Sequence, residues 1–237
     1  MVHFMILYTY MKKKNTNKRN TMKKQKSNAS QQHGIDFENE IHLHTHGKSK
    51  VEYEKLIKGG YTAEHDIQKG ILSDVNISVK TSKGNAIACG DVMRMFDITK
   101  REAFTILVGH YTQVGNKKHY NKISEFYITP DVYDRLWGKV KYKELKKYVD
   151  YVKSIPHGKE AQLKHQKIWR ENIKSLKDKC GLMALRTKVD GKAQRRTQCS
   201  LNINDLLSSD INSKEYTYKY NGMKLPYIQK SAERTFN

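Results

Sequence analysis

The sequence predicts a mixed α/β fold, of the α+β kind, in which helices flank a small mixed central sheet and a basic β-hairpin is added. Two observations predict this class. Segments with helix-like spacing of apolar residues alternate along the chain with short runs of β-branched and aromatic residues. Late in the chain, the turn dipeptide Asp190-Gly191 separates two such β-rich runs, and many residues around it are basic.

The charge of the chain indicates its partner. Its 237 residues include 45 Lys and Arg against 24 Asp and Glu, a formal net charge of +21 at pH 7. Such an excess repels itself unless a polyanion neutralises it, so we expect nucleic acid as the partner, with an anionic membrane surface as the weaker rival. No apolar run is long enough to predict a membrane span. Three cysteines without metal-type spacing predict neither a disulfide framework nor a zinc ribbon.

The first thirty residues predict a disordered basic arm, and residues 31–237 a single domain. The first ten residues are apolar but lack the basic region and cleavage site of a secretory signal, so we expect an intracellular protein, in the cytoplasm or nucleus of a host cell. Met11 and Met22 are alternative initiators. Between Met11 and Ser30 there are eight basic residues and no acidic one. This stretch is either a solvated tail, a phosphate-binding arm or a localisation signal.

The expected elements begin with a helix near Gly34, where apolar residues recur at helical spacing with acidic residues between them. From Ala63 to Ser82 apolar and polar residues alternate with a period of two, which predicts a β-hairpin with its turn at Ser73-Asp74. The other expected elements are a helix over 51–57 that ends at Gly59-Gly60, a helix over 90–101 with Asp91 in its first turn, strands over 104–108 and 125–129, helices over 133–152 and 160–179, and a hairpin of 183–188 with 197–203.

The predicted hairpin over 63–82 contains the first candidate for chemistry. Asp74 and Lys80 are six residues apart on one strand, so they would be roughly 20 Å apart and could not act on one phosphate. Asp66 fits better. If both strands turn their odd residues inward, a short odd-length loop around Ser73 brings Asp66 beside Lys80 and Gln68 beside Ser78.

This segment resembles the PD-(D/E)XK nuclease superfamily, whose signature is a metal-binding Asp on one strand of a hairpin and an acid-x-Lys element on the next. The resemblance implies a restriction-endonuclease-like core and a Mg²⁺ ion, with Mn²⁺ as an alternative, because phosphodiester hydrolysis needs a polarising metal and a basic group to manage the attacking water. It assigns Asp66 and the Val79 carbonyl to the metal and Lys80 to the water. Ser78 stands where the family has an acid.

Because Ser78 is a neutral and weaker ligand, the resemblance implies either that the missing charge is supplied from elsewhere or that the metal is held less tightly. The sequence GIDFENEI resembles the acid-bearing first helix of the family, so Glu38 is the auxiliary metal ligand that we expect, with Glu40 as the next choice. The helix GDVMRMF after the Lys80 strand fits the family order, and its Arg94 either contacts a phosphate or lies on the surface.

The sequence LRTKVDGKAQRRTQCSL resembles the basic recognition hairpin of type II restriction endonucleases of viruses and bacteria. Arg can bind guanine O6 and N7, and Gln can bind adenine N6 and N7, so a two-stranded ribbon of this composition suits the major groove. The alternative is an exposed hairpin whose cations serve solubility or contact phosphates only. The expected DNA-binding residues, besides Arg94, are Arg186, Lys188, Lys192, Gln194, Arg195, Arg196 and Gln198.

The histidines are weaker candidates for a metal-binding or catalytic site. The triplet His42, His44 and His46 has no evident Cys or distant His partner, so a polar helix end is favoured over a zinc site. His110 and His119 lack the spacing of an HNH nuclease.

Together these patterns predict a Mg²⁺-dependent, sequence-specific endonuclease of double-stranded DNA of the restriction type. A homodimer, and a cognate methyltransferase acting on the same site, go with that expectation. The alternatives are a junction resolvase or repair nuclease on the same fold, and a catalytically inactive or non-specific basic DNA-binding protein.

Overall fold

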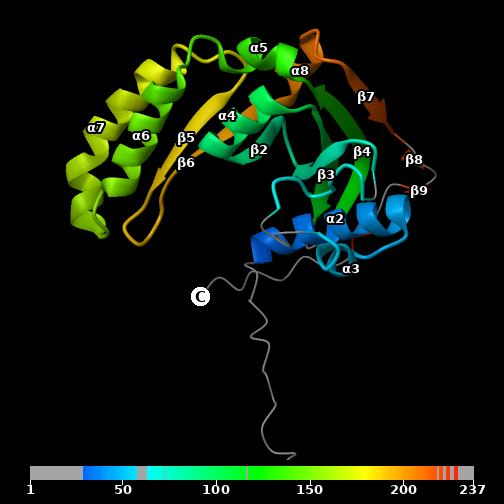
Figure 1. Ribbon diagram of the computed structural model, residues 1–237. Helices are drawn as coiled ribbons and strands as arrows, with labels where there is room; N and C mark the ends of the chain where they lie inside the picture. The colour runs from blue at the N-terminus through cyan, green and yellow to red at the C-terminus, as the bar shows by residue number, and fades with distance from the viewer. Residues whose placement is uncertain are drawn as a thin grey trace, which may run out of the picture.

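The computed structural model describes residues 29–57, 63–71, 73–115, 117–217, 219–220, 223–224 and 227–228 (Figure 1). Its helices are α2 (Ala29–His46), α3 (Lys50–Glu54), α4 (Val92–Arg101), α5 (Tyr133–Trp137), α6 (Tyr142–Ser154), α7 (Lys159–Lys177) and α8 (Ile203–Ser208), with the 3-10 turn η2 (Pro130–Val132). Its strands are β1 (Asn76–Ser82), β2 (Ala86–Asp91), β3 (Phe104–Val114), β4 (Lys117–Ile128), β5 (Ala184–Val189), β6 (Arg195–Asn202), β7 (Ser213–Tyr216), β8 (Lys219–Tyr220), β9 (Met223–Lys224) and β10 (Tyr227–Ile228). Residues 1–28 of the predicted arm and the predicted helix stop at Gly59-Gly60 lie outside the described residues.

The main strands form two sheets. In the larger one β1 runs parallel to β3, β3 and β4 are antiparallel, and β7 and β10 both pair with β4. The smaller sheet is antiparallel, in the order β2-β6-β5, and contains the predicted basic hairpin β5–β6. The mixed α/β class, with a mixed sheet flanked by helices, is therefore confirmed.

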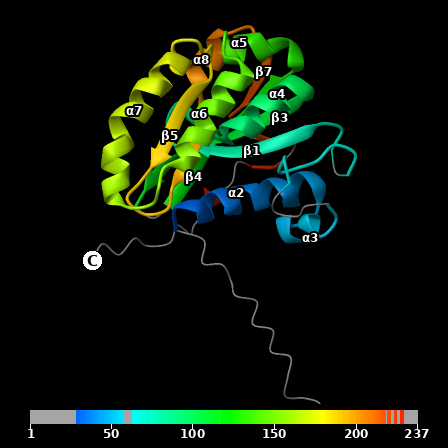
Figure 2. The ribbon, with the colours of Figure 1, turned by 60° about the vertical axis from the view of Figure 1, so that its left-hand side comes forward.

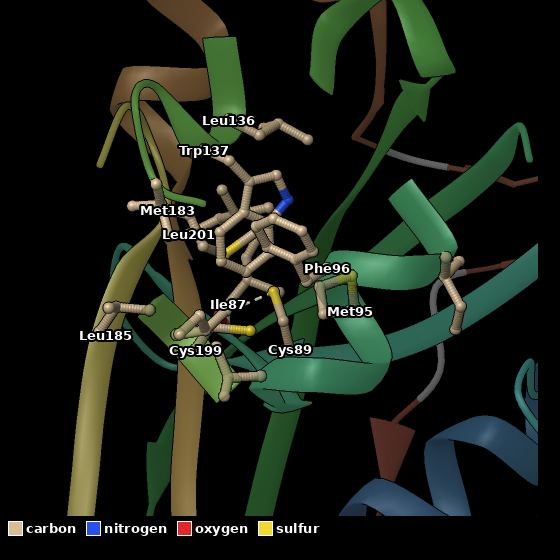
Figure 3. Close-up of a cluster of buried hydrophobic side chains, with 14 of the residues drawn as sticks. Ile87, Cys89, Met95, Phe96, Leu136, Trp137, Met183, Leu185, Cys199 and Leu201 are labelled. Carbon is tan, nitrogen blue, oxygen red and sulfur yellow. Dashed lines mark hydrogen bonds between the residues drawn. The ribbon is translucent and has the colours of Figure 1, made fainter. Parts of the chain in front are cut away.

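Apolar side chains pack on both faces of the larger sheet. Leu107 of β3 faces α2, where it joins Phe37 and Ile41, while its neighbours Ile106 and Val108 face the opposite side. On that opposite side the smaller sheet and the helices α4 to α7 complete the core, and side chains of β2, β6, α4 and α5 meet there (Figure 3). Figures 1 and 2 show α2 on one side of the sheet and α4, α6 and α7 on the other. The edge strand β1 therefore contacts α2 of one layer and β2 of the other.

The predicted hairpin over 63–82 is only partly formed. Its second strand is β1, but the backbone of residues 63–71 pairs with the backbone of β1 only at the antiparallel bridge Ile67↔Ile77, as far as the described residues show. The chain turns at Gly70 and Ile71, and the Gly70 N–H donates to the Ser73 carbonyl, whereas the turn was expected at Ser73-Asp74. Ile71 and Val75, which the period-two pattern assigned to the core, are more than 40% exposed. Apolar alternation overestimated the pairing because Ile71 lies in the turn and Val75 lies between the turn and the start of β1.

Two other elements differ in length from the prediction. The strands β3 and β4 are paired from Phe104↔Ile128 to Val114↔Lys117, so the polar residues around the Gly115 turn extend the hairpin instead of forming a loop. The helix expected over 133–152 is broken into α5 and α6 at Gly138, whose φ of 58° and close approach to the Lys179 carbonyl require glycine. The strand β2 follows no pattern that the sequence made visible.

Within the described residues, no helix is both long and apolar enough to cross a membrane.

Candidate active site at the edge of strand β1

The Asp66 carboxylate lies at the free edge of β1, beside Val79 and Lys80. Ile67 and Ile77 exchange two backbone hydrogen bonds of 3.0 and 2.8 Å, which aligns the chain with the start of β1. Beyond that bridge the Asp66 side chain replaces backbone pairing: its Oδ2 accepts the Val79 N–H at 2.7 Å and the Lys80 Nζ at 2.9 Å. The bridge thus delivers the acid to the strand that carries the lysine.

The Lys80 ammonium bridges two oxygens. Besides Asp66 Oδ2 it donates to the Val79 carbonyl, also at 2.9 Å, and the Ser78 Oγ lies 3.5 Å from the same Asp66 oxygen. The side chains of Asp66 and Lys80 remain 28% and 25% exposed, so solvent and ligands can reach them. The three predicted residues of the motif therefore meet around one carboxylate.

The register of this contact differs from the prediction. The Ile67↔Ile77 bridge places Asp66 opposite Ser78, not opposite Lys80, and Gln68 does not face Ser78. Lys80 reaches Asp66 as a diagonal neighbour, because a long side chain can span the distance to residue j+2 across a strand pair. The expected contact is present, but for a different geometric reason.

Glu38, on the helix α2, lines the same small cavity as Asp66. This cavity is about 20 Å³ in volume, and it is also lined by Lys50, Tyr53, Glu54, Ile57, Ala63 and His65. The Glu38 Oε2 accepts the Lys50 Nζ at 2.5 Å, and the Glu38 carboxylate lies 4.0 Å from His42. Glu40, the other candidate, pairs with His44 at 3.3 Å and does not line this cavity. Of the two acids, the geometry selects Glu38.

The two carboxylates differ in proton affinity. Burial and the nearby charge of Asp66 raise the pKa of Glu38 to about 7, although Lys50 opposes the shift. Burial also opposes the ionisation of Asp66, but the charge and hydrogen bond of Lys80 and the Val79 N–H outweigh it and lower the pKa of Asp66. Asp66 is therefore an anion at neutral pH, while Glu38 is partly protonated.

The donor set suits a hard divalent cation. Two carboxylates line one cavity, and the Val79 carbonyl points to the same strand edge as its N–H, since both groups of a strand residue face one side. Among the described residues Asp66 Oδ1 accepts no hydrogen bond, so it is available to a ligand. Oxygen ligands of this kind fit Mg²⁺ or Mn²⁺. No group of three or more His, Cys, Asp or Glu side chains gathers for a metal in the described part of the chain, so water and substrate oxygens would have to complete the shell.

The histidine triplet is divided between two faces of α2, with the rings of His42 and His46 6.2 Å apart on one face. His42 is fully buried and its ring lies 4.8 Å from that of Tyr53, whereas the His44 side chain is half exposed and pairs with Glu40.

The basic hairpin presents one polar face to solvent. Arg186 pairs with Gln198 and Lys188 with Arg196 across the strands, and the two arginines and the lysine are exposed. In the turn, the Asp190 Oδ1 accepts the backbone N–H groups of Lys192 and Gln194, whose side chains are exposed. The other face of the hairpin, with Leu185 and Val189, packs in the core with Ile173 and Leu176 of α7. The hairpin is therefore packed against the core on the face opposite its exposed cations.

Arg195 corrects the predicted list. It is 8% exposed, and its guanidinium donates to the backbone carbonyls of Ile155, Pro156, Asp190 and Gln194 at 2.5 to 2.9 Å. It points inward because strand alternation puts it on the face opposite Arg196. Arg195 therefore braces the turn against the end of α6, and it is not available to DNA.

Arg94 is exposed on α4, which agrees with both readings of the sequence, a phosphate contact and a plain surface position. Asp91 is the N-cap of this helix rather than part of its first turn, and its side chain accepts the Arg94 N–H at 3.0 Å.

Two residues of the site were missed from the sequence. Lys50 and Tyr53 belong to α3, which begins with a capping box between Ser49 and Glu52. A helix was expected over 51–57, and the S-x-x-E spacing, which is a helix-start signal, could have placed its first residue at Lys50. Nothing in the sequence indicated that its side chains reach Glu38 and Gln68, because those contacts are made between separate segments.

Comparison of the chain with models of protein families, with curated proteins and with solved structures finds no match.

Proposed function

We propose that this chain is a Mg²⁺-dependent, sequence-specific endonuclease of double-stranded DNA, built on a PD-(D/E)XK-type, restriction-endonuclease-like core. The observation that carries the proposal is the contact of Asp66 with both Val79 and Lys80 at an open strand edge, with Glu38 across the same small cavity. Ion pairs that serve only the fold also perturb pKa values, but here a second carboxylate, that of Glu38, lines the same cavity, and the Val79 carbonyl lies at the same strand edge.

The roles follow from the donor atoms. Asp66, Glu38 and the Val79 carbonyl would hold the metal, which when bound polarises the phosphate and lowers the pKa of a water. Lys80 would remain an ammonium, and after moving off Asp66 Oδ2 it would orient that water by donating a hydrogen bond to it, or stabilise charge on the phosphate. Ser78, 3.5 Å from Asp66, would contribute a hydroxyl to the shell without adding charge.

Other features support a DNA substrate and this core. The parallel strands β1 and β3 are joined by β2 and α4, so the helix follows the Lys80 strand as the family order requires. The exposed face of β5–β6, with Arg186, Lys188, Arg196 and Gln198, has the side chains that read guanine and adenine edges. Recognition of a palindromic site would favour a homodimer and a cognate methyltransferase.

One observation favours the inactive alternative. The Lys80 ammonium already neutralises Asp66, and the position of the family's second acid is held by Ser78, so the same residues could merely close the edge of β1 in a basic DNA-binding protein. A junction resolvase or repair nuclease would share the metal site and need no base-reading hairpin.

The test is cleavage of plasmid and viral DNA of mixed sequence in Mg²⁺, with fragments resolved on a gel and their ends sequenced. We expect discrete fragments from the wild type, and a loss of rate of about 10²-fold or more in both Asp66→Asn and Lys80→Ala. The matched controls are Asp74→Asn and Lys69→Ala, which remove the same charges from exposed positions of the same segment and should cut normally.

Binding without cleavage in Mg²⁺ and in Mn²⁺ would reject the nuclease and favour the inactive DNA-binding protein. Cleavage of branched but not linear duplex DNA would favour the resolvase. Equal losses in the control variants would mean that charge alone, and not the site, had been tested.

A further inference from the structure

The short helix α3 lies against α2 beside the candidate metal-binding carboxylates. It begins at Ser49, whose Oγ accepts the Glu52 N–H at 3.3 Å while the Ser49 N–H donates to Glu52 at 2.7 Å. The first residue of the helix, Lys50, donates its backbone N–H to Asn39 Oδ1 of α2 at 3.0 Å. These bonds fix α3 relative to α2, which a helix of five residues could not achieve by its own stability.

Tyr53 connects α3 to the segment that carries Asp66. It is 1% exposed, its ring packs against His42, and its phenol oxygen accepts the Gln68 N–H at 2.5 Å. Gln68 is two residues after Asp66. Because Ile67 uses its backbone groups on the β1 side, the neighbouring Gln68 N–H points away from β1, toward Tyr53. The segment is therefore held on one side by a strand and on the other by a phenol.

We propose that Tyr53 is a positioning residue, which holds Asp66 at the edge of β1 through the Gln68 N–H. The Ile67↔Ile77 bridge alone supplies two backbone hydrogen bonds, and a segment held on one side can rotate about that line. The other contacts of the segment are made by His65 with Glu102 at 3.4 Å, by Glu64 with Arg101, and by the Lys69 N–H with Asn76. Tyr53 adds a hydrogen bond from α3 to this segment on the side opposite β1.

The role of Asp66 as a metal ligand rests on the proposed function, but its position does not. The Val79 N–H reports that position directly, since its acceptor is Asp66 Oδ2. If Asp66 moves away, this edge amide loses its acceptor and exchanges its hydrogen with solvent faster.

The experiment is amide hydrogen exchange, followed residue by residue in two-dimensional NMR spectra of the full chain. In Tyr53→Phe, which keeps the ring, we expect the Val79 amide to exchange up to about tenfold faster than in the wild type, approaching its rate in Asp66→Ala. The matched control is Tyr127→Phe, which removes a phenol that donates to Glu125 on β4 and should leave the Val79 rate unchanged. Asn39→Ala, which loosens α3 without altering Tyr53, should act in the same direction and serves if Tyr53→Phe does not fold.

A Val79 exchange rate that is unchanged in both Tyr53→Phe and Asn39→Ala would overturn the positioning role. In the cleavage assay, Tyr53→Phe should raise the Mg²⁺ concentration that gives half-maximal rate and leave the KM for DNA unchanged. If the wild type does not cut DNA, the proposed function fails, while the exchange rates still decide whether Tyr53 positions Asp66.

Discussion

At the scale of residues, the molecule holds its buried acids in two ways. Glu125 accepts hydrogen bonds from three phenols, those of Tyr127, Tyr216 and Tyr220, at 2.7 to 3.0 Å, on both of its oxygens. Asp66 has all its bonds on Oδ2 and leaves Oδ1 without a partner among the described residues. A saturated carboxylate serves the fold, whereas a half-saturated one beside a lysine can still take a ligand.

His110 leads to a prediction about pH. Burial, and then the charge of Lys122, lower its pKa from 6.5 to about 4, while Glu215 opposes the shift; its Nε2 lies 2.8 Å from the Ser124 hydroxyl. The unfolded chain therefore takes up this proton near pH 6.5 and the folded chain only near pH 4. It follows that the free energy of unfolding contributed by His110 is present above pH 6.5 and is lost as the pH falls toward 4.

We expect His110→Gln, which can still bond to Ser124, to reduce the fall in unfolding free energy between pH 6.5 and 4, as measured by urea denaturation. The pKa of His42 is also lowered to about 4, so His42 contributes to the fall in unfolding free energy between pH 6.5 and 4 in both the wild type and His110→Gln. Substitution of the exposed His44 by Gln is the control. An identical pH profile for wild type and His110→Gln would contradict the prediction.

At the scale of elements, the position of α2 depends on one close approach to the sheet. Phe37 of α2 lies over Gly109 of β3 and stacks on Tyr120 of β4, with ring centroids 4.3 Å apart. A Cβ on residue 109 would come within 2.4 Å of the Phe37 ring. The absence of a side chain there lets α2 approach the sheet closely, and this contact sets where Glu38 lies relative to Asp66.

Gly109→Ala should lower the free energy of unfolding by about 1–3 kcal/mol, because a methyl group is forced into a packed interior. Urea denaturation measures it, with Gly84→Ala as control, since a Cβ at residue 84 meets nothing within 4 Å. Adding Phe37→Leu to Gly109→Ala should cost less than the sum of the two single changes, because the smaller side chain makes room. Strict additivity would show that the two residues do not compete for space.

At the scale of the whole molecule, the candidate site and the basic hairpin lie on different sheets. The larger sheet carries the Asp66–Lys80 site at its edge, and the smaller sheet carries the basic hairpin, with a shared hydrophobic core between them. The net charge of +21 acts over the whole surface and favours any polyanion, so only the placement of particular cations can distinguish a binding face from general attraction.

This division predicts a difference in salt dependence. Replacing Arg186, Lys188 and Arg196 with Gln should lower the slope of log Kobs against log salt for duplex DNA by about 2 to 3, if each cation neutralises one phosphate. The control replaces the exposed Lys164, Lys174 and Lys177 of α7, on the helix that covers the opposite face of the hairpin, and removes the same charge. Equal changes in slope, measured by fluorescence anisotropy, would show that the hairpin face has no special role.

Much of this arrangement was accessible from the sequence where it depends on neighbours along the chain. The hairpin β5–β6 follows from its turn dipeptide and flanking β-rich runs, and the choice of Asp66 over Asp74 follows from the rise of a strand. The prediction failed for residues whose contacts are made with segments far away in the sequence. The strand β2 pairs with β6, more than a hundred residues later, and Arg195 was assigned to DNA although its acceptors include Ile155 and Pro156.

The sequence by itself determined the mixed α/β class, the excess of positive charge, and the pair of Asp66 with Lys80, because composition and local periodicity are properties of consecutive residues. Only the tertiary structure decided that Glu38 and not Glu40 faces that pair, that Lys50 and Tyr53 complete its surroundings, and that Arg195 is internal. The physical reason is that these side chains are placed by the packing of α2, α3 and α6 against other segments. A pattern within one segment does not indicate which side chain of another segment will pack against it.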